Sequence, residues 1–115
     1  MRKYVLVFII LLSSCNNMYF DTDTIYIYEG RYTSTIIYRI ENNYIYSGRY
    51  SNEVKYRIEN DLIYDGRYGL TVKYRIENDF VYSGMYGIDV VCRIENDLIY
   101  SGKFDNTVLY RIEKK

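Results

Sequence analysis

The sequence has no histidine, no proline and no tryptophan, and only two cysteines among its 115 residues. Without histidine the chain lacks an imidazole base, a Ser-His or Cys-His nucleophile pair, and a histidine ligand for a metal ion. Cys15 belongs to an N-terminal signal motif, which leaves Cys92 without a disulfide partner. We therefore expect no enzyme, no cofactor and no metal site.

Neither sign of charge is in excess, because 15 Lys and Arg balance 15 Asp and Glu. A nucleic-acid-binding protein needs a surplus of basic side chains to neutralise phosphates. Loss of Arg2 and Lys3 with a leader would leave two more acidic than basic groups. The charge balance therefore argues against nucleic acid as a partner.

Aromatic residues are abundant instead: 17 Tyr and 4 Phe make up 18% of the chain. Tyr and β-branched residues favour strands, so the composition predicts an all-β protein. The length allows one domain.

Residues 1–15 have the order of a signal peptide: two cations, Arg2 and Lys3, then an apolar run over residues 4–12 and two serines. Nine residues span only about 14 Å as a helix, against the roughly 30 Å of a bilayer core. The run is too short to remain as a transmembrane anchor.

The segment ends in Leu12-Ser13-Ser14-Cys15, which resembles the lipobox of bacterial lipoproteins. The resemblance implies cleavage before Cys15, acylation of this cysteine with palmitate or a similar chain, and a lipid anchor in the cell envelope. Since Asn16 is not the Asp that retains enterobacterial lipoproteins at the inner membrane, it implies the outer membrane in a Gram-negative host. An ordinary secretory leader and a buried N-terminal strand are the alternatives.

An 18-residue repeat follows, and we divide the chain into a signal peptide (1–15), a tether (16–24) and a five-copy β-repeat domain (25–115). Two positions define the period. They are the glycines Gly30, Gly48, Gly66, Gly84 and Gly102, and the arginines of Arg-Ile-Glu, Arg39, Arg57, Arg75, Arg93 and Arg111. No insertion or deletion interrupts the period, so the spacing itself has structural meaning.

Within a copy, even-numbered positions from Leu62 to Asn78 are mostly apolar or aromatic, and odd-numbered positions are mostly charged. This alternation is typical of half-buried strands. Because 18 is even, we expect all five copies to turn the same parity inward.

An odd loop length keeps paired residues of a hairpin on one face, so we expect three-residue turns at Glu59-Asn60-Asp61 and at Gly69-Leu70-Thr71. Gly66 would then face Tyr74 and leave room for its ring. Asp65 would face Arg75 as a cross-strand ion pair, as Glu29 would face Arg39. The arginines as a set are predicted to form a solvated, salt-paired face.

The units together predict a ten-stranded antiparallel meander, either a twisted open sheet or a sheet rolled into a barrel. Eighteen residues is also three hexapeptides, the coil length of a left-handed β-helix, which is the alternative architecture. The Tyr-x-Gly-Arg-Tyr core at residues 46–50 and 64–68 resembles the membrane occupation and recognition nexus repeat, although the period here is shorter. Ile-Tyr-x-Gly-Arg is also similar to four-fold beta flower proteins. Both resemblances imply hairpin arrays and no activity.

Two kinds of side chain remain as candidates for function. Cys92 takes the slot that is tyrosine in the other copies, and we expect it to be buried as a small apolar residue. Tyrosines on an open face could bind a protein or a glycan. The tyrosines that we consider for this role are Tyr46, Tyr64, Tyr82 and Tyr100. The sequence thus favours a lipid-anchored structural or protein-interaction module, with glycan or peptidoglycan binding by Tyr and Arg as the alternative.

Overall fold

The computed structural model describes residues 24–114, so the predicted signal peptide, with Cys15, and all but the last residue of the predicted tether lie outside the described residues. The described chain forms ten strands and no helix. They are β1 (Ile25–Glu29), β2 (Ile36–Glu41), β3 (Tyr44–Ser47), β4 (Val54–Glu59), β5 (Leu62–Asp65), β6 (Val72–Glu77), β7 (Phe80–Ser83), β8 (Val90–Glu95), β9 (Leu98–Ser101) and β10 (Val108–Lys114).

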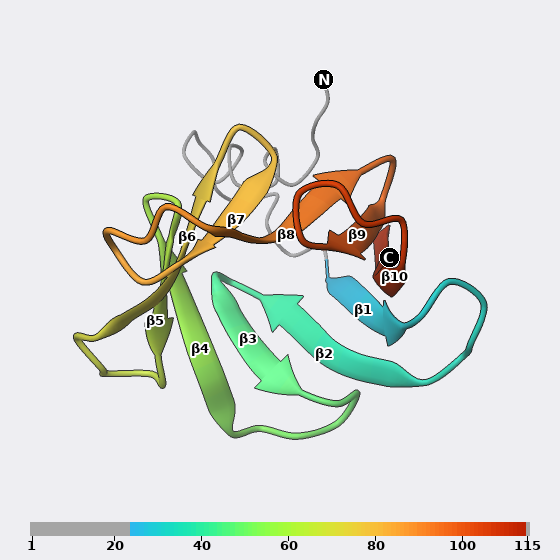
Figure 1. Cartoon of the computed structure of the whole chain (residues 1–115). Helices are drawn as coiled ribbons and strands as arrows, with labels where there is room; N and C mark the ends of the chain where they lie inside the picture. The colour runs from blue at the N-terminus through green and yellow to red at the C-terminus, as the bar shows by residue number, and fades with distance from the viewer. Residues whose placement is uncertain (1–23, 115) are drawn as a thin grey trace.

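Each strand pairs antiparallel with the next, and β1 pairs with β10, so the sheet closes into a barrel (Figure 1). The closing ladder joins Ile25 to Lys114 and Ile27 to Ile112. Closure leaves no strand edge unpaired. The prediction of an antiparallel ten-stranded meander rolled toward a barrel is confirmed, and the β-helix alternative is excluded.

The short connections contain two residues, where we predicted three. Glu59 pairs with Leu62 as the last rung of the β4–β5 ladder, so only Asn60 and Asp61 lie in the turn. Both have left-handed backbone conformations, with φ of 53° and 67°. Two consecutive positive φ values are those of a type I′ turn, and Asn and Asp adopt them at low cost.

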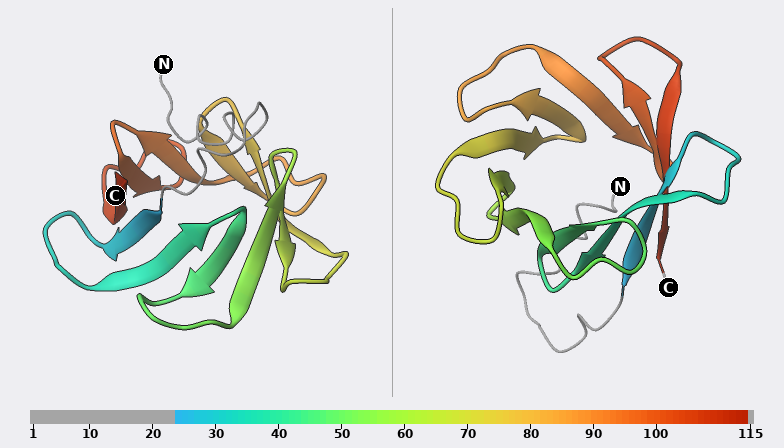
Figure 2. Two further views of the ribbon diagram at one scale, coloured as in Figure 1. Left: turned by 180° about the vertical axis from the view of Figure 1, so that it is seen from behind. Right: turned by 90° about the horizontal axis from the view of Figure 1, so that it is seen from below.

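The other connections are longer than predicted. β5 ends at Asp65 and β6 begins at Val72, which leaves residues 66–71 as a loop. The prediction that strand residues continue to Tyr68 is wrong, and so is the pairing of Gly66 with Tyr74. Ile63 pairs with Tyr74, and Tyr64 pairs with Val72 across a β-bulge. The five loops of this kind project around the barrel (Figure 2).

Even-length connections invert the facing parity twice in each repeat. Tyr56 and Ile58 face inward on β4, but after the two-residue turn it is Ile63 that faces inward on β5, and then Tyr74 on β6. The predicted constant parity is therefore wrong within a copy. It holds from copy to copy because two inversions cancel over 18 residues.

The interior of the barrel is lined by tyrosine rings and isoleucine side chains that pair across the ladders. The rings of Tyr38 and Tyr56 meet edge to face with centroids 6.4 Å apart, although their strands are not neighbours in the sheet. Ile27, Ile45 and Ile94 are buried, and Ile27 pairs with Tyr38 and Ile45 with Tyr56 across their ladders. Aromatic side chains thus converge toward the axis, where they stay partly exposed.

The repeat glycines serve backbone conformation and not the predicted steric room. Gly66 has a φ of +77°, and a Cβ built on it would meet nothing within 4 Å. Its N–H donates to the carbonyl oxygen of Lys55 on the neighbouring strand at 2.8 Å. The repeat glycine therefore directly follows each odd-numbered strand, in a left-handed conformation that a residue with a Cβ adopts only at a cost.

Candidate functional site

The arginines of the Arg-Ile-Glu motif lie on the outer face of the barrel, each stacked on a tyrosine of a neighbouring strand. Arg57 pairs with Tyr64 across the β4–β5 ladder, and its guanidinium carbon lies 4.3 Å from the ring centroid. The stack recurs in every copy at 4.2 or 4.3 Å, in Arg39–Tyr46, Arg57–Tyr64, Arg75–Tyr82, Arg93–Tyr100 and Arg111–Tyr28. Each pair is a cation–π contact with little access to water.

The same guanidinium holds the next long loop against the barrel. Nη1 of Arg57 donates to the carbonyl oxygens of Arg67 and Gly69, at 2.9 and 3.0 Å. Arg111 makes the equivalent bonds to Arg31 and Thr33, across the seam where the barrel closes. Planar arginine with several donors suits this combination of stacking and bridging.

The carboxylate partner of each arginine lies two residues along its own strand. Nε of Arg75 is 3.3 Å from Glu77, and each of the other four arginines also contacts the Glu two residues further on, Arg57 through Nη2 at 3.7 Å. The predicted cross-strand pairs of Asp65 with Arg75 and of Glu29 with Arg39 are wrong, because the register places other residues opposite. The arginine side chains are only 9–22% exposed, which corrects the prediction of a solvated face.

Four of the stacked tyrosines are those that we considered for binding from the sequence. Tyr46, Tyr64, Tyr82 and Tyr100 all lie on the outer face, half-buried, and each has a guanidinium over its ring. A ring face covered in this way offers little area to a ligand. Their place in the structure is that of a clamp for the long loops.

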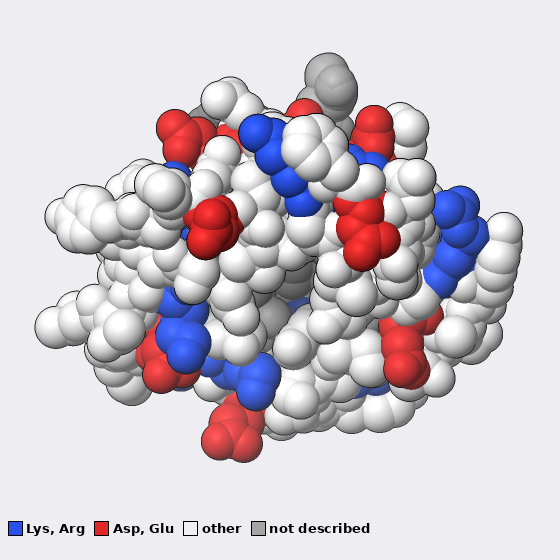
Figure 3. Space-filling model, viewed as in Figure 1, with Lys and Arg blue, Asp and Glu red and all other residues white. Residues whose placement is uncertain are grey.

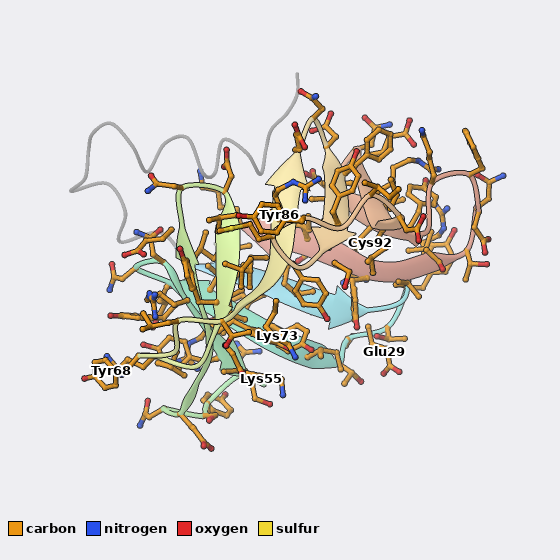
Figure 4. All side chains as sticks on the ribbon, turned by 60° about the vertical axis from the view of Figure 1, so that its left-hand side comes forward. Glu29, Lys55, Tyr68, Lys73, Tyr86 and Cys92 are labelled. Carbon is orange, nitrogen blue, oxygen red and sulfur yellow. The ribbon has the colours of Figure 1, made fainter. Side chains whose placement is uncertain are left out.

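A different set of aromatic side chains is exposed to solvent. At the second position after each repeat glycine, an aromatic side chain is 83–87% exposed at the end of its loop. The set is Tyr32, Tyr50, Tyr68, Tyr86 and Phe104. Figure 4 shows Tyr68 pointing away from the barrel. Such exposure of large aromatic side chains, repeated five times, is the feature of this molecule most typical of a binding surface.

We missed these residues in the sequence because even parity assigned them to the core. A usable signal was present: each follows a glycine by two positions, and in three copies a turn-forming Ser, Thr or Asp comes next. Glycine and turn formers together indicate a loop that has left the sheet, where parity no longer applies.

Four of the five exposed aromatics follow a basic residue. Arg49 lies between its own Tyr50, at 5.6 Å, and Tyr26 of β1, at 5.4 Å. Arg67 lies 4.7 Å over Tyr44 of β3. Arg49, Arg67 and Lys103 thus link their loops to an aromatic ring on an earlier strand, and they keep positive charge beside the exposed rings.

The exposed tips lie at the opposite end of the barrel from the point where the chain enters. Ile25 pairs with Ile40 and Lys114, and Ile40 is two residues from the Asn42-Asn43 turn. The N-terminus of β1 therefore lies at the end with the two-residue turns. The long loops begin at the other end and spread outward.

The bore offers few reactive groups. Cys92 takes the place that corresponds to Tyr38, Tyr56, Tyr74 and Tyr110, where its thiol is free and partly buried. Burial raises the pKa of Cys92 to about 11, so the thiol stays protonated. Desolvation, with smaller contributions from Tyr110 and Tyr56, also raises the pKa of Tyr38.

Within residues 24–114 there is no group of three or more His, Cys, Asp or Glu side chains that could hold a metal ion. The same residues include no helix of the length and apolarity needed to cross a membrane.

Five β-hairpins closed into a barrel, with loops that spread outward from one end, define a flower-like repeat protein. Residues 25–115 match the family model of the 6-fold beta flower protein, and the chain belongs to this family. The barrel described here is closed by five copies. Searches among curated proteins and among solved structures gave no match.

Proposed function

We propose that this beta flower protein is a lipid-anchored, non-catalytic interaction module of the bacterial cell envelope, which binds another envelope component through its loop tips. The observation that carries the proposal is the set of five aromatic side chains exposed by 83–87%. In an isolated domain such side chains contribute nothing to the core, whereas at an interface they supply rigid, amphipathic contact area.

The loops are built to present these rings in a constant position. The Arg57 guanidinium binds two carbonyl groups of the loop that carries Tyr68, and a bulge and a left-handed glycine start that loop. A loop that is already ordered loses less conformational entropy on binding. Rigid presentation therefore supports a role in recognition.

The proposed location in the cell envelope rests on the lipobox-like segment that ends in Cys15. A chain acylated there would enter the barrel at the end with the two-residue turns. The loops at the other end would then face away from the anchoring membrane. Radiolabelled palmitate should enter the wild-type protein and be absent from Cys15→Ala; equal labelling of both would overturn the anchor.

A photo-crosslinking amino acid tests the interaction in living cells. Placed at Tyr50 or Phe104, it should give a discrete crosslinked product, while the same amino acid at Asn60, an exposed turn residue, should give none. Equal products from tips and turn, or none from the tips, would contradict binding through the loops.

Glycan or peptidoglycan binding is the second candidate, and the pairing of a cation with an exposed ring favours it. Arg31 with Tyr32 and Lys103 with Phe104 are such pairs, at 5.9 and 5.6 Å. Sedimentation with purified peptidoglycan should then be lost in a variant with serine at all five tips. A fully retained association would exclude the tips as the glycan site.

A further inference from the structure

Two of the five loops differ from the others in chemistry. The loops of residues 66–71 and 84–89 read Tyr-Gly-Leu and Tyr-Gly-Ile at their tips, and we call them the apolar loop pair. In the other three loops the corresponding two positions are Thr33-Ser34, Ser51-Asn52 and Asp105-Asn106.

The polar loops are closed by their own side chains. The N–H of Glu53 donates to Oγ of Ser51 at 3.1 Å, and the N–H of Thr107 donates to Oδ1 of Asp105 at 2.9 Å. These are the short turns that Ser and Asp commonly make with their own backbone.

The apolar loop pair has a different backbone. A Cβ on Gly69 would collide with the carbonyl oxygen of Asp65, and one on Gly87 would collide with that of Ser83. Glycine is required there by close approach of the chain, so these two loops have a conformation of their own.

The apolar loop pair exposes aliphatic side chains that its siblings lack. Leu70 is 86% exposed and Ile88 is 85% exposed, beside Tyr68, Tyr86 and the partly exposed Met85. The loops are successive around the barrel, since they join β5 to β6 and β7 to β8. In Figure 3 the margin where they lie in Figure 1 is formed by uncharged side chains.

We propose that the apolar loop pair is the contact surface for a second copy of this chain, related by a two-fold axis that runs between the two loops. Such an axis places the loop of residues 66–71 against the loop of residues 84–89 of the second copy, and the reverse. Leu70 would then contact Ile88 of the second copy, and Tyr68 would contact Tyr86.

Charge supports this pairing of unlike loops. Arg67 is the one charged residue of the loop 66–71, and Asp89 is the one charged residue of the loop 84–89. In this register Arg67 faces the uncharged Met85 and Asp89 faces the uncharged Thr71, whereas like loops would bring Arg67 to Arg67 or Asp89 to Asp89. Met85 in the place that is basic in the other loops removes a further repulsion.

Area supports a second copy as the occupant. The five exposed side chains offer on the order of 600 Å², which approaches the roughly 800 Å² that each partner contributes to a standard interface. An axis parallel to the barrel also keeps the N-termini of both copies at the same end. Two chains anchored to one membrane, as the proposed function has it, could therefore pair side by side.

Disulfide crosslinking tests the arrangement residue by residue. Full-length Leu70→Cys and Ile88→Cys chains, each in a Cys15→Ser background, are mixed in detergent and oxidised. A disulfide-linked dimer of the two different chains should form at least about tenfold faster than from a matched mixture of Asn52→Cys and Asn106→Cys on polar loops. Equal rates in both mixtures would overturn the two-fold contact.

The absence of tryptophan provides a second measurement. Tyr68→Trp, also in a Cys15→Ser background, creates a single tryptophan, whose emission should shift to shorter wavelength as protein concentration rises, with no lipid present. Leu70→Asp in the same chain should raise the dissociation constant at least about tenfold, and Asn52→Asp should leave it unchanged. A shift seen only with phosphatidylcholine vesicles would overturn the proposal in favour of a lipid surface.

These chains carry no acyl group, so the result is independent of the lipid anchor. Failure of palmitate labelling would leave a concentration-dependent dimer intact. Conversely, a labelled protein that stays monomeric at all concentrations in light scattering would retain the anchor and refute the dimer.

Discussion

The guanidinium of Arg57 stacks on Tyr64 at 4.3 Å and at the same time binds the backbone of residues 67 and 69, which lie ten and twelve positions further along the chain. A single side chain thereby joins two strands and a loop. Because the contact recurs in all five copies and crosses the seam through Arg111, it is a repeated clamp on the outside of the barrel.

Replacement of Arg57 by lysine should lower the free energy of unfolding by about 1–3 kcal/mol, because an ammonium group cannot stack and bridge two carbonyl groups at once. Urea unfolding measures the change. Arg31→Lys is the matched control, since Arg31 is exposed in a loop and should change stability by less than about 0.5 kcal/mol. Equal effects of the two substitutions would show that the clamp has no special role.

Gly66→Ala should destabilise the protein by about 1–2 kcal/mol, because φ is +77° and alanine disfavours that region. Gly66→Asn should cost less than alanine, because asparagine adopts left-handed conformations and the space around the glycine is open. The order of the two costs in urea or thermal unfolding is the readout. A greater cost for the larger asparagine would instead indicate that the glycine provides room.

Asp61→Asn should stabilise the barrel at pH 7 and have less effect at pH 3. Burial raises the pKa of Asp61, so in the folded state the charged form is disfavoured. The contribution of this carboxyl to stability is therefore greatest at low pH and declines as pH rises through its folded pKa. Urea unfolding at the two pH values tests this, and a gain that is the same at both would contradict it.

Cys92 should react very slowly with a thiol reagent in the folded protein. With a pKa of about 11, the thiolate at pH 8 is on the order of one part in a thousand. Labelling of a Cys15→Ser chain should become fast in urea. Rapid labelling without denaturant would place the thiol at the surface.

Much of the fold was predictable from the sequence because alternation and an exact 18-residue period are properties of local backbone geometry. They predicted strands, five equal units and an antiparallel meander. The register was not predictable in the same way, since Glu59 is polar enough for a turn yet pairs with Leu62 in a ladder. A two-residue turn and a three-residue turn are both compatible with the same sequence, and only the pairing of the strands distinguishes them.

The candidate site shows the same division. The sequence made the tyrosines conspicuous but assigned Tyr68 to the core and Tyr64 to possible binding. The structure exposes Tyr68 and covers Tyr64 with Arg57. Which ring is free depends on a guanidinium from a neighbouring strand, a contact that no local pattern encodes.

The sequence by itself determined the strand-forming period and the number of copies, because these follow from the preferences of single residues and their neighbours. The tertiary structure alone decided that the fifth copy closes on the first, that parity inverts within each copy, and which aromatic side chains reach solvent. Those outcomes depend on contacts between distant residues, as when Arg111 near the C-terminus holds the loop of Arg31 near the start of the barrel.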